Sequence, residues 1–366
     1  MKRLIFLMFL MFVCVLAVSA DEAIGVFANS NTNSIQFIDP LTMETSVNYL
    51  GGELGSYGGG LFDMVITPDG KTAIVSNFGD SRIFCIDISG GFNTRPVLKC
   101  SIRLPFFAED IAITKDGKYA VVTDGGFSNR AAVIGFYNGH CYLIKSNNLG
   151  ANKYANAVDI IWCDNIQRYC VVFADYFQGK VYAYTMQDDG EGTLVFNKSA
   201  HVLPCRPVNV AISPDAKTVI AVDAGGPFCV ALSFDNQCVM YKSKIVQMPF
   251  RSGQSCVFNK AGTKAYYLSN SRLGGTQVVV LNVNGPGDVS VSSTNIKVTP
   301  TRGTSQLFGV DTIALDPSEQ YLYVTNPTLS GGKGRVSVID LNVNAQVHYL
   351  DAKGIPTGIA FTTIEE

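Results

Sequence analysis

The sequence predicts an all-β protein, a seven-bladed β-propeller of four-stranded antiparallel blades. Three observations predict this fold. One pattern of strands and turns recurs about every 48 residues, the strands are rich in Val, Ile, Tyr, Phe and Thr, and no segment has the pattern of a long amphipathic helix. Repeated four-stranded units of this kind are typical of propellers, in which the blades stand around a central channel.

The first element is a leader that is typical of an export signal. In residues 1–20, Lys2 and Arg3 precede an apolar run of about 15 residues, and small residues follow up to Ala20. We expect residues 21–366 to form a single propeller domain that is periplasmic, secreted or at the cell surface. An uncleaved membrane anchor is the alternative, but about 20 apolar residues are needed to span a bilayer. No later stretch is that long, so we expect no membrane span in the mature chain.

The repeat is clearest in the strand–turn–strand segments Asp63–Asn77 and Asp110–Asp124. Each has a short apolar strand, an Asp-Gly-Lys turn and a second apolar strand that closes on Asn or Asp. Gly70 and Gly117 supply the left-handed backbone conformation that such a turn requires. The closing residues of the seven repeats are Asn29, Asn77, Asp124, Asp175, Asp223, Asn270 and Asn326.

The last repeats carry a more specific phrase. Tyr323-Val324-Thr325-Asn326 and the strand Val336–Asp340 resemble the characteristic phrases of the YVTN-repeat propellers, and Ile74–Asn77 resembles the first of them in another blade. The resemblance covers the mature chain almost end to end and implies seven blades. It departs at the turns of blade four, Asp164–Gln167, and blade six, Lys260–Gly262. Because that family contains surface-layer and periplasmic binding proteins as well as relatives of lactonases, the resemblance implies a binding protein, with a lactone hydrolase as the alternative.

The two ends of the repeat region are complementary. Residues 23–50 hold three strands but no inner strand, whereas Gly358–Thr362 is an inner strand with nothing after it. We predict that this C-terminal strand completes the first blade and removes the open edge of the ring. We expect the closed ring to be a monomer.

Nine cysteines remain after the leader. Cys85 with Cys100, or Cys163 with Cys170, are close enough in sequence to bridge neighbouring strands in an oxidising compartment. The alternative is that most of the nine are buried, unpaired thiols that pack as small hydrophobic groups.

Charge and composition exclude several functions. Removing Lys2 and Arg3 from the 28 basic residues leaves 26 against 30 acidic ones, a net charge of −4. Nucleic acid and anionic membranes need a concentrated basic surface, so we expect neither as a partner. The chain has three histidines and no haem-attachment, zinc-pair, Ser-nucleophile or phosphate-loop motif. We therefore predict no catalytic residue and no evident cofactor.

The residues that open the inner strands are predicted to line one mouth of the channel. In successive blades they are Asp63, Asp110, Asp159, Asn209, Ser255, Thr312 and Gly358. The first three form an acidic arc on adjacent blades. Three basic residues precede the inner strands of blades five to seven and are expected opposite that arc, namely Arg206, Arg251 and Arg302.

Such a mouth predicts a ligand site made by the three Asp, Asn209 and the three Arg. It suits a divalent cation such as calcium, or a ligand that bears both charges. Alternatively, each Asp accepts backbone N–H groups and holds neighbouring blades together. We predict a non-enzymatic protein that binds a protein, glycan or small molecule at this face. The other candidates are a lactonase-type hydrolase and a subunit that accompanies a redox partner.

Overall fold

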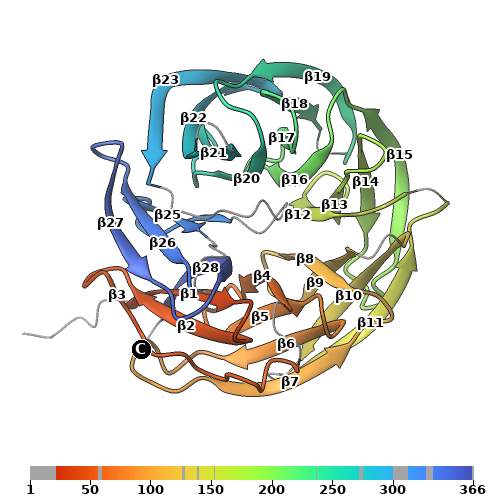
Figure 1. Ribbon diagram of the computed structural model, residues 1–366. Coiled ribbons are helices and arrows are strands. Elements are labelled where there is room, and N and C mark those ends of the chain that lie inside the picture. The colour runs from red at the N-terminus through yellow and green to blue at the C-terminus, as the bar shows by residue number, and fades with distance from the viewer. Residues whose placement is uncertain are drawn as a thin grey trace, which may run out of the picture.

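The structure is a computed structural model that describes residues 22–56, 60–125, 128–137, 140–151, 153–235, 237–271, 275–299, 312–326 and 333–364. These residues form seven four-stranded antiparallel sheets and no helix. The sheets stand around a central channel as the blades of a propeller (Figure 1). The predicted fold class is confirmed, whereas the predicted export signal, residues 1–20, lies outside the described residues.

Each blade is named here by its place in the chain, with its strands in order from the channel outward. Blade 1 contains β28 (Pro356–Ile364), β1 (Glu22–Asn29), β2 (Ser34–Asp39) and β3 (Glu44–Thr45); blade 2 contains β4 (Leu61–Ile66), β5 (Thr72–Asn77), β6 (Arg82–Asp87) and β7 (Val97–Arg103). Blade 3 contains β8 (Ala108–Ile113), β9 (Tyr119–Asp124), β10 (Arg130–Tyr137) and β11 (His140–Asn148); blade 4 contains β12 (Ala157–Cys163), β13 (Arg168–Asp175), β14 (Lys180–Met186) and β15 (Leu194–Val202). Blade 5 contains β16 (Pro207–Ile212), β17 (Thr218–Asp223), β18 (Phe228–Phe234) and β19 (Met240–Gln247); blade 6 contains β20 (Gly253–Phe258), β21 (Lys264–Ser271), β22 (Gly275–Gly285) and β23 (Asp288–Val298); blade 7 contains β24 (Ile313–Leu315), β25 (Tyr321–Asn326), β26 (Arg335–Asp340) and β27 (Ala345–Asp351).

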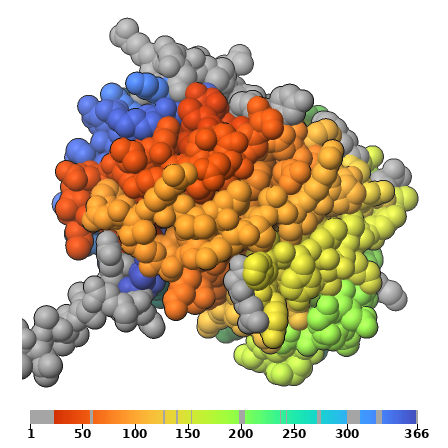
Figure 2. Space-filling model, turned by 90° about the horizontal axis from the view of Figure 1, so that it is seen from below, coloured from red at the N-terminus to blue at the C-terminus, as the bar shows by residue number. Residues whose placement is uncertain are grey.

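Burial follows the position of a strand within its blade. The second strands β9 and β17 bury all of their residues, because both faces of each blade pack against the neighbouring blades. The outer strand β7 instead alternates exposed and partly buried residues. Seen from another side, the outer surfaces of the first blades follow one another in chain order (Figure 2). The high content of apolar residues is thus the consequence of sheets that are buried on two faces.

The C-terminal strand closes the ring as predicted. β28 pairs antiparallel with β1, from Glu22 opposite Ile364 to Asn29 opposite Pro356. The two strands lie together as blue and red ribbons in Figure 1. Among the residues described, no helix has the length and apolar character needed to cross a bilayer.

In blades 2 to 6, the turns between inner and second strands each contain one residue in the left-handed backbone conformation, although their sequences differ. Gly70 and Gly117 have φ angles of 72° and 71°. Ala216 occupies the same place in blade 5 with φ 56° and Gly262 in blade 6 with φ 67°, whereas in blade 4 the left-handed residue is Gln167, one position later, with φ 50°. Blade 6 thus keeps a glycine in the left-handed conformation despite its different turn sequence, whereas blades 4 and 5 place that conformation on a residue with a side chain.

The structure contains neither of the two predicted disulfide pairs. Cys100 bonds to Cys141 and Cys170 bonds to Cys238, so each disulfide joins two neighbouring blades. Cys163 is a free, buried thiol that lies opposite Arg168 in the strand register, whereas Cys170 lies opposite Ile161. Nearness in sequence favoured pairs within a blade, but the stacking of blades brings sulfurs from different sheets together.

Candidate functional site

The start of the inner strand is irregular in most blades, and this irregularity builds the site. In blade 3, Ala108 pairs with Asp124 and Ile111 with Val122, so two residues, Glu109 and Asp110, oppose one. Blade 2 has the same β-bulge at Phe62 and Asp63. A bulge re-aims side chains that would otherwise alternate between faces. Two successive residues of one strand can therefore face the channel.

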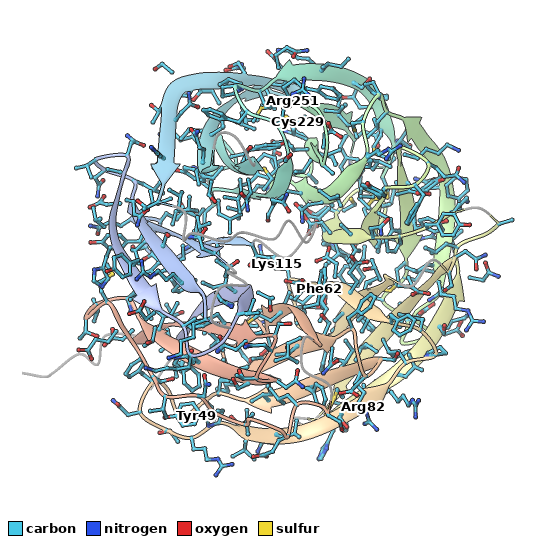
Figure 3. The ribbon with its side chains drawn as sticks, in the orientation of Figure 1. Tyr49, Phe62, Arg82, Lys115, Cys229 and Arg251 are labelled. Carbon is cyan, nitrogen blue, oxygen red and sulfur yellow. A yellow bond between two sulfur atoms is a disulfide. The ribbon has the colours of Figure 1, made fainter. Side chains whose placement is uncertain are left out.

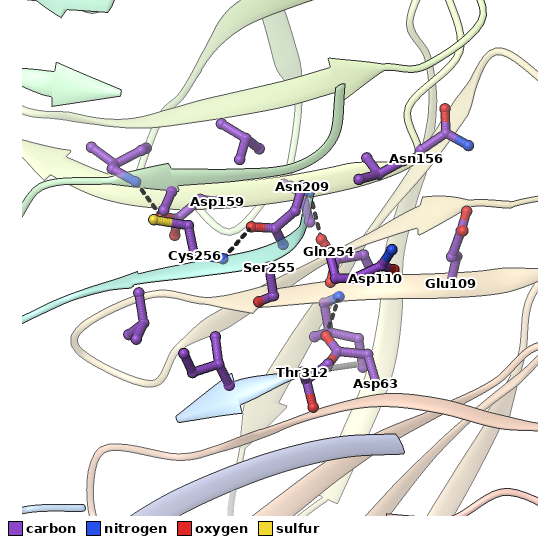
Figure 4. Close-up of a pocket in the computed structure, with 18 of the residues that line it drawn as sticks. Asp63, Glu109, Asp110, Asn156, Asp159, Asn209, Gln254, Ser255, Cys256 and Thr312 are labelled. Carbon is purple, nitrogen blue, oxygen red and sulfur yellow. Dashed lines mark hydrogen bonds between the residues drawn. The ribbon is translucent and has the colours of Figure 1, made fainter. Parts of the chain in front are cut away.

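The channel contains a cavity of about 310 Å³. Four of its side chains are carboxyl groups, Asp63, Glu109, Asp110 and Asp159, which we call the channel carboxylates. The other polar lining side chains are Asn156, Asn209, Gln254, Ser255 and Thr312. Figure 4 shows these groups converging from several blades. Among the described residues that line this cavity, none is Lys, Arg or His.

The Asp residues of the arc also join the blades. Oδ2 of Asp63 accepts the backbone N–H of Ile111 at 3.1 Å, and Oδ2 of Asp110 accepts that of Val158 at 2.8 Å. Each acceptor thus takes a donor from the inner-strand region of the next blade. The expectation that these Asp residues hold neighbouring blades together is confirmed.

The same bond recurs in the next two blades. Asp159 accepts the N–H of Ile212 at 2.7 Å, and Asn209 accepts that of Cys256 at 3.2 Å. The amide oxygen of Asn209 therefore performs the structural task of the Asp oxygens without their charge. The bond between blades accounts for an oxygen acceptor at this position, but not for a carboxylate.

A hydroxyl group next to the closing residue completes the bulge. Thr123 accepts the N–H of Asp110 at 3.0 Å and donates to the carbonyl of Asn156 in blade 4 at 3.1 Å. Ser76 does the same between Asp63 and the carbonyl of Glu109. This arrangement gives the Ser or Thr of the repeated phrase a physical role, which is to satisfy the bulge and to join two blades.

Burial raises the pKa of each channel carboxylate. For Glu109, desolvation raises the pKa to about 8, against a hydrogen bond with Asn156 that lowers it, and Asp124 and Asp63 add repulsion. Oε2 of Glu109 is buried and has no hydrogen-bond partner among the described residues. The site thus contains a carboxyl group that its protein surroundings leave partly unsatisfied.

The three Asp residues are shifted in the same direction. Desolvation raises the pKa of Asp159 to about 6, although the N–H groups of Ile212 and Ile160 lower it. Desolvation also raises the pKa of Asp63, and it raises the pKa of Asp110 well above the usual range, with repulsion from Asp63 as the next cause. A side-chain hydrogen bond between the two carboxyl groups lowers the pKa of Asp63 and raises that of Asp110.

The predicted basic residues are placed differently from the arc. Arg206 and Arg251 are exposed, and neither lines the cavity. The guanidinium of Arg206 lies 5.7 Å from the centre of the Tyr176 ring. Figure 3 places Arg251 toward the periphery of the ring and Phe62 at the channel. Arg302 lies outside the described residues.

The remaining residues that open inner strands lie at the channel as expected. Ser255 and Thr312 line the cavity, and the hydroxyl of Thr312 donates to the carbonyl of Thr357 at 2.8 Å. Gly358 lies against the backbone of Asp63, and a Cβ atom added at Gly358 would lie 2.7 Å from the Cα of Asp63. Blade 1 therefore contributes backbone and Ile359, rather than a polar side chain, to this level of the channel.

Sequence reasoning missed Glu109, Asn156 and Gln254. Strict strand alternation predicts that Glu109 and Gln254 face away from Asp110 and Ser255, but the bulges turn both members of each pair inward. The sequence signal for Glu109 and Gln254 is that each is a polar residue directly before the Asp or Ser of the inner strand. In the described part of the chain, the one close group of three or more potential metal ligands is Cys85, Cys100 and Cys141, not a set of carboxylates.

Comparison with known proteins shows the fold. Neither a protein-family model nor a curated protein sequence matches the chain. A solved structure of a functionally unknown protein from Desulfotomaculum acetoxidans is 18% identical, covers 93% of this chain and 99% of that one, and has a TM-score of 0.73. A candidate 6-phosphogluconolactonase from Bacteroides uniformis is 12% identical, with coverages of 94% and 100% and a TM-score of 0.68. Apo AztD from Citrobacter koseri is 13% identical, with coverages of 95% and 100% and a TM-score of 0.65. The resemblance to YVTN-repeat proteins stays a prediction.

Proposed function

We propose that this protein is an exported, non-enzymatic propeller that binds a small cationic ligand in its central channel. The observation that carries the proposal is the set of four channel carboxylates in a cavity whose described lining residues include no Lys, Arg or His. None of them takes part in the ion pairs found among the described residues. Buried carboxylates without a counter-charge are costly, so they favour either protonation or a bound cation.

The cavity selects for charge and for hydrogen-bond donors. Its carboxyl and amide oxygens accept hydrogen bonds, and its volume of about 310 Å³ suits a small molecule. A phosphorylated substrate would add negative charge to this lining. The activity named for the Bacteroides uniformis protein therefore receives no support from the charge of this cavity, and an organic ammonium or guanidinium compound is the better candidate.

Calcium is the inorganic candidate cation for the same site. It requires six to eight oxygen ligands within about 2.6 Å. No three carboxylates of the described residues lie close enough together to form such a set. An extended organic cation can instead contact oxygens from different blades, which is the arrangement that the channel offers.

The test is a matched ligand series in a calorimetric titration. Putrescine, 1,4-butanediol and succinate share a four-carbon chain and differ in charge. We expect binding and thermal stabilisation with putrescine only, and a calcium chloride titration separates the inorganic alternative. Equal responses to all three organic compounds, or binding of succinate alone, would contradict the proposal.

Asp159→Asn is the variant that separates binding from folding. Asn209 already makes the bond between blades with an amide oxygen, so an amide at position 159 can keep the bond to the N–H of Ile212 and removes the charge. The substitution loses the bond that the second carboxylate oxygen accepts from the N–H of Ile160. We expect about tenfold weaker putrescine binding, since one lost ion pair is worth about 1.4 kcal/mol or more in a desolvated site. The lost bond to Ile160 costs about 1 kcal/mol, so the melting temperature without ligand should fall by no more than about 2 °C. The matched control is Asp215→Asn, at an exposed turn outside the cavity, which should bind as the parent does.

A lactone hydrolase is the second candidate, and Glu109 favours it. A carboxylate with a pKa raised to about 8 in a cavity is suited to accept a proton from an attacking water. Neutral lactones are the substrates that the acidic lining would admit. If the protein hydrolyses γ-butyrolactone above pH 8 and Glu109→Gln loses this activity, the protein is a lactone hydrolase and the binding proposal is wrong. Activity that survives this substitution would not be a reaction of this site.

The proposal also includes export of the protein and its oligomeric state. N-terminal sequencing of the protein recovered from the medium or periplasm should begin at Asp21, and a start at Met1 would contradict export. We propose a monomer whose partner, whether protein, glycan or small molecule, meets the channel face. Size-exclusion chromatography with light scattering tests the oligomeric state.

A further inference from the structure

The outer edges of blades 2 and 3 hold a cluster of three cysteine sulfurs. Cys85 in β6, Cys100 in β7 and Cys141 in β11 have sulfur atoms that all lie within 4.8 Å of one another. Cys100 is bonded to Cys141, while Cys85 is a free thiol. A thiol next to a disulfide is the arrangement from which thiol–disulfide exchange proceeds.

Cys100 has two possible partners that the fold has already brought close. It is opposite Cys85 in the register between β6 and β7, within blade 2. It is bonded to Cys141 across the blades, with the two Cα atoms 6.5 Å apart, and the N–H of Cys141 donates to Cys100 Sγ at 3.2 Å. The Cys100–Cys141 pair has the Cα separation of a disulfide, and Cys85 and Cys100 face each other across two paired strands with their sulfur atoms within 4.8 Å.

We propose that these three cysteines form a thiol–disulfide exchange site, in which Cys85 and Cys141 compete for Cys100. The Cys85 thiol gives its proton to solvent, and its sulfur attacks Cys100 Sγ. A Cys85–Cys100 bond forms, the Cys100–Cys141 bond breaks, and Cys141 leaves with the electron pair and takes up a proton. No electrons are gained or lost overall, so the step needs no oxidant or reductant.

The exchange changes what the protein presents. Cys85 is buried, whereas Cys141 is only partly buried on the outer strand of blade 3. After exchange, the covalent link between blades 2 and 3 is gone and the free thiol lies on the outer strand of blade 3. That thiol can attack a small disulfide such as oxidised glutathione, which forms a mixed disulfide at Cys141 and releases one glutathione thiolate.

Two other observations bear on this assignment. Burial raises the pKa of the Cys85 thiol to about 12, so its thiolate is scarce at neutral pH and exchange is slow enough to be trapped by acid. The same three sulfurs also have the spacing of a metal site. Because two of them are bonded to each other, the structure favours exchange over a three-thiolate site for a soft metal ion.

Peptide mapping can test the proposal directly, because trypsin separates the three cysteines. Cleavage after Arg82, Lys99, Arg103, Arg130 and Lys145 places them in peptides 83–99, 100–103 and 131–145. The purified protein is acid-quenched, alkylated under denaturing conditions and digested without reduction. We expect two linked species, 100–103 with 131–145 and 83–99 with 100–103. A single species, 100–103 with 131–145, after incubation at pH 8.5 with catalytic glutathione would overturn the proposal.

Variants test the exchange without depending on the relative amounts of the two disulfide-linked peptide pairs. In Cys141→Ser treated with oxidised glutathione, peptides 83–99 and 100–103 should become linked, whereas two alkylated thiols would refute the exchange. In Cys85→Ser, the glutathione adduct on peptide 131–145 should disappear, and an unchanged adduct would also refute it. Cys229→Ser, another buried free thiol, is the matched control and should reproduce the parent pattern. If the Cys141 variant does not fold, the Cys85 comparison still decides.

Discussion

Glu109 gives a prediction with an unusual sign, that the propeller becomes less stable as the pH rises from 5 to 8. The pKa of this carboxyl is raised from 4.5 to about 8 in the folded protein. Over this interval the unfolded chain releases the proton while the folded protein keeps it. The folded state therefore binds more protons than the unfolded state, and the free energy of unfolding falls with increasing pH.

The size of the effect follows from the two pKa values. Integrating the difference in bound protons from pH 5 to pH 8 gives a loss of about 3.5 kcal/mol. Solvent screening and relaxation around the ionised carboxylate reduce such a penalty, so we expect about 2 kcal/mol. For a chain of this length, an unfolding entropy of about 2.1 cal/mol/K per residue converts this to a fall of about 3 °C in the melting temperature.

Glu109→Gln isolates the effect, because it removes the titrating group and keeps the size of the side chain. Differential scanning calorimetry of both proteins at pH 5 and pH 8 is the assay. We expect similar stability at pH 5 and a variant that is about 3 °C more stable at pH 8. Glu53→Gln, at an exposed ion pair with Arg95, is the control and should follow the parent. Parallel pH profiles of parent and Glu109→Gln would refute the reasoning, and putrescine should shift the parent more than the variant.

Three further predictions concern the ring and can be measured by urea denaturation. Gly70→Ala should lower the free energy of unfolding by about 2 kcal/mol, because φ is positive and the added Cβ would lie 2.5 Å from the Thr363 carbonyl oxygen. Gly190→Ala, which also has a positive φ but open space around the added Cβ, should lower it by about 1 kcal/mol. Equal losses in the two variants would contradict the role of the contact with Thr363. Replacing both Cys170 and Cys238 by Ala should cost about 4 kcal/mol from the chain entropy of a loop of 68 residues, and a loss below about 1 would count against that disulfide. Deleting residues 354–366 removes the strand that pairs with β1, so cooperative unfolding of the whole ring should shift; an unchanged midpoint would show that closure is dispensable.

Much of the fold could be predicted from the sequence because its signals are local. A strand, a tight turn and a closing Asn or Asp recur in each blade, and each is specified by a few neighbouring residues. The missing inner strand at the start and the extra one at the end predicted the pairing of β28 with β1, which the structure confirms. The seven predicted closing residues lie at or next to the ends of the second strands, and all are buried.

The site could be predicted only where it depends on a regular repeat. Asp63, Asp110, Asp159 and Asn209 occupy equivalent positions, so their meeting at the channel followed from the periodicity. Glu109 was hidden, because its inward direction depends on a bulge that strand alternation does not contain. The basic residues were expected opposite the arc from their order in the chain alone, and order does not fix the direction of a long side chain outside a strand.

The sequence by itself determined the number of blades, the identity of their strands and the strand that closes the ring, since each of these depends on local propensity and periodicity. Tertiary structure decided which cysteines bond, which side chains face the channel and how far their pKa values shift. These properties depend on distances between sheets that are remote in sequence, and on burial that exists only once all seven blades stand around the channel.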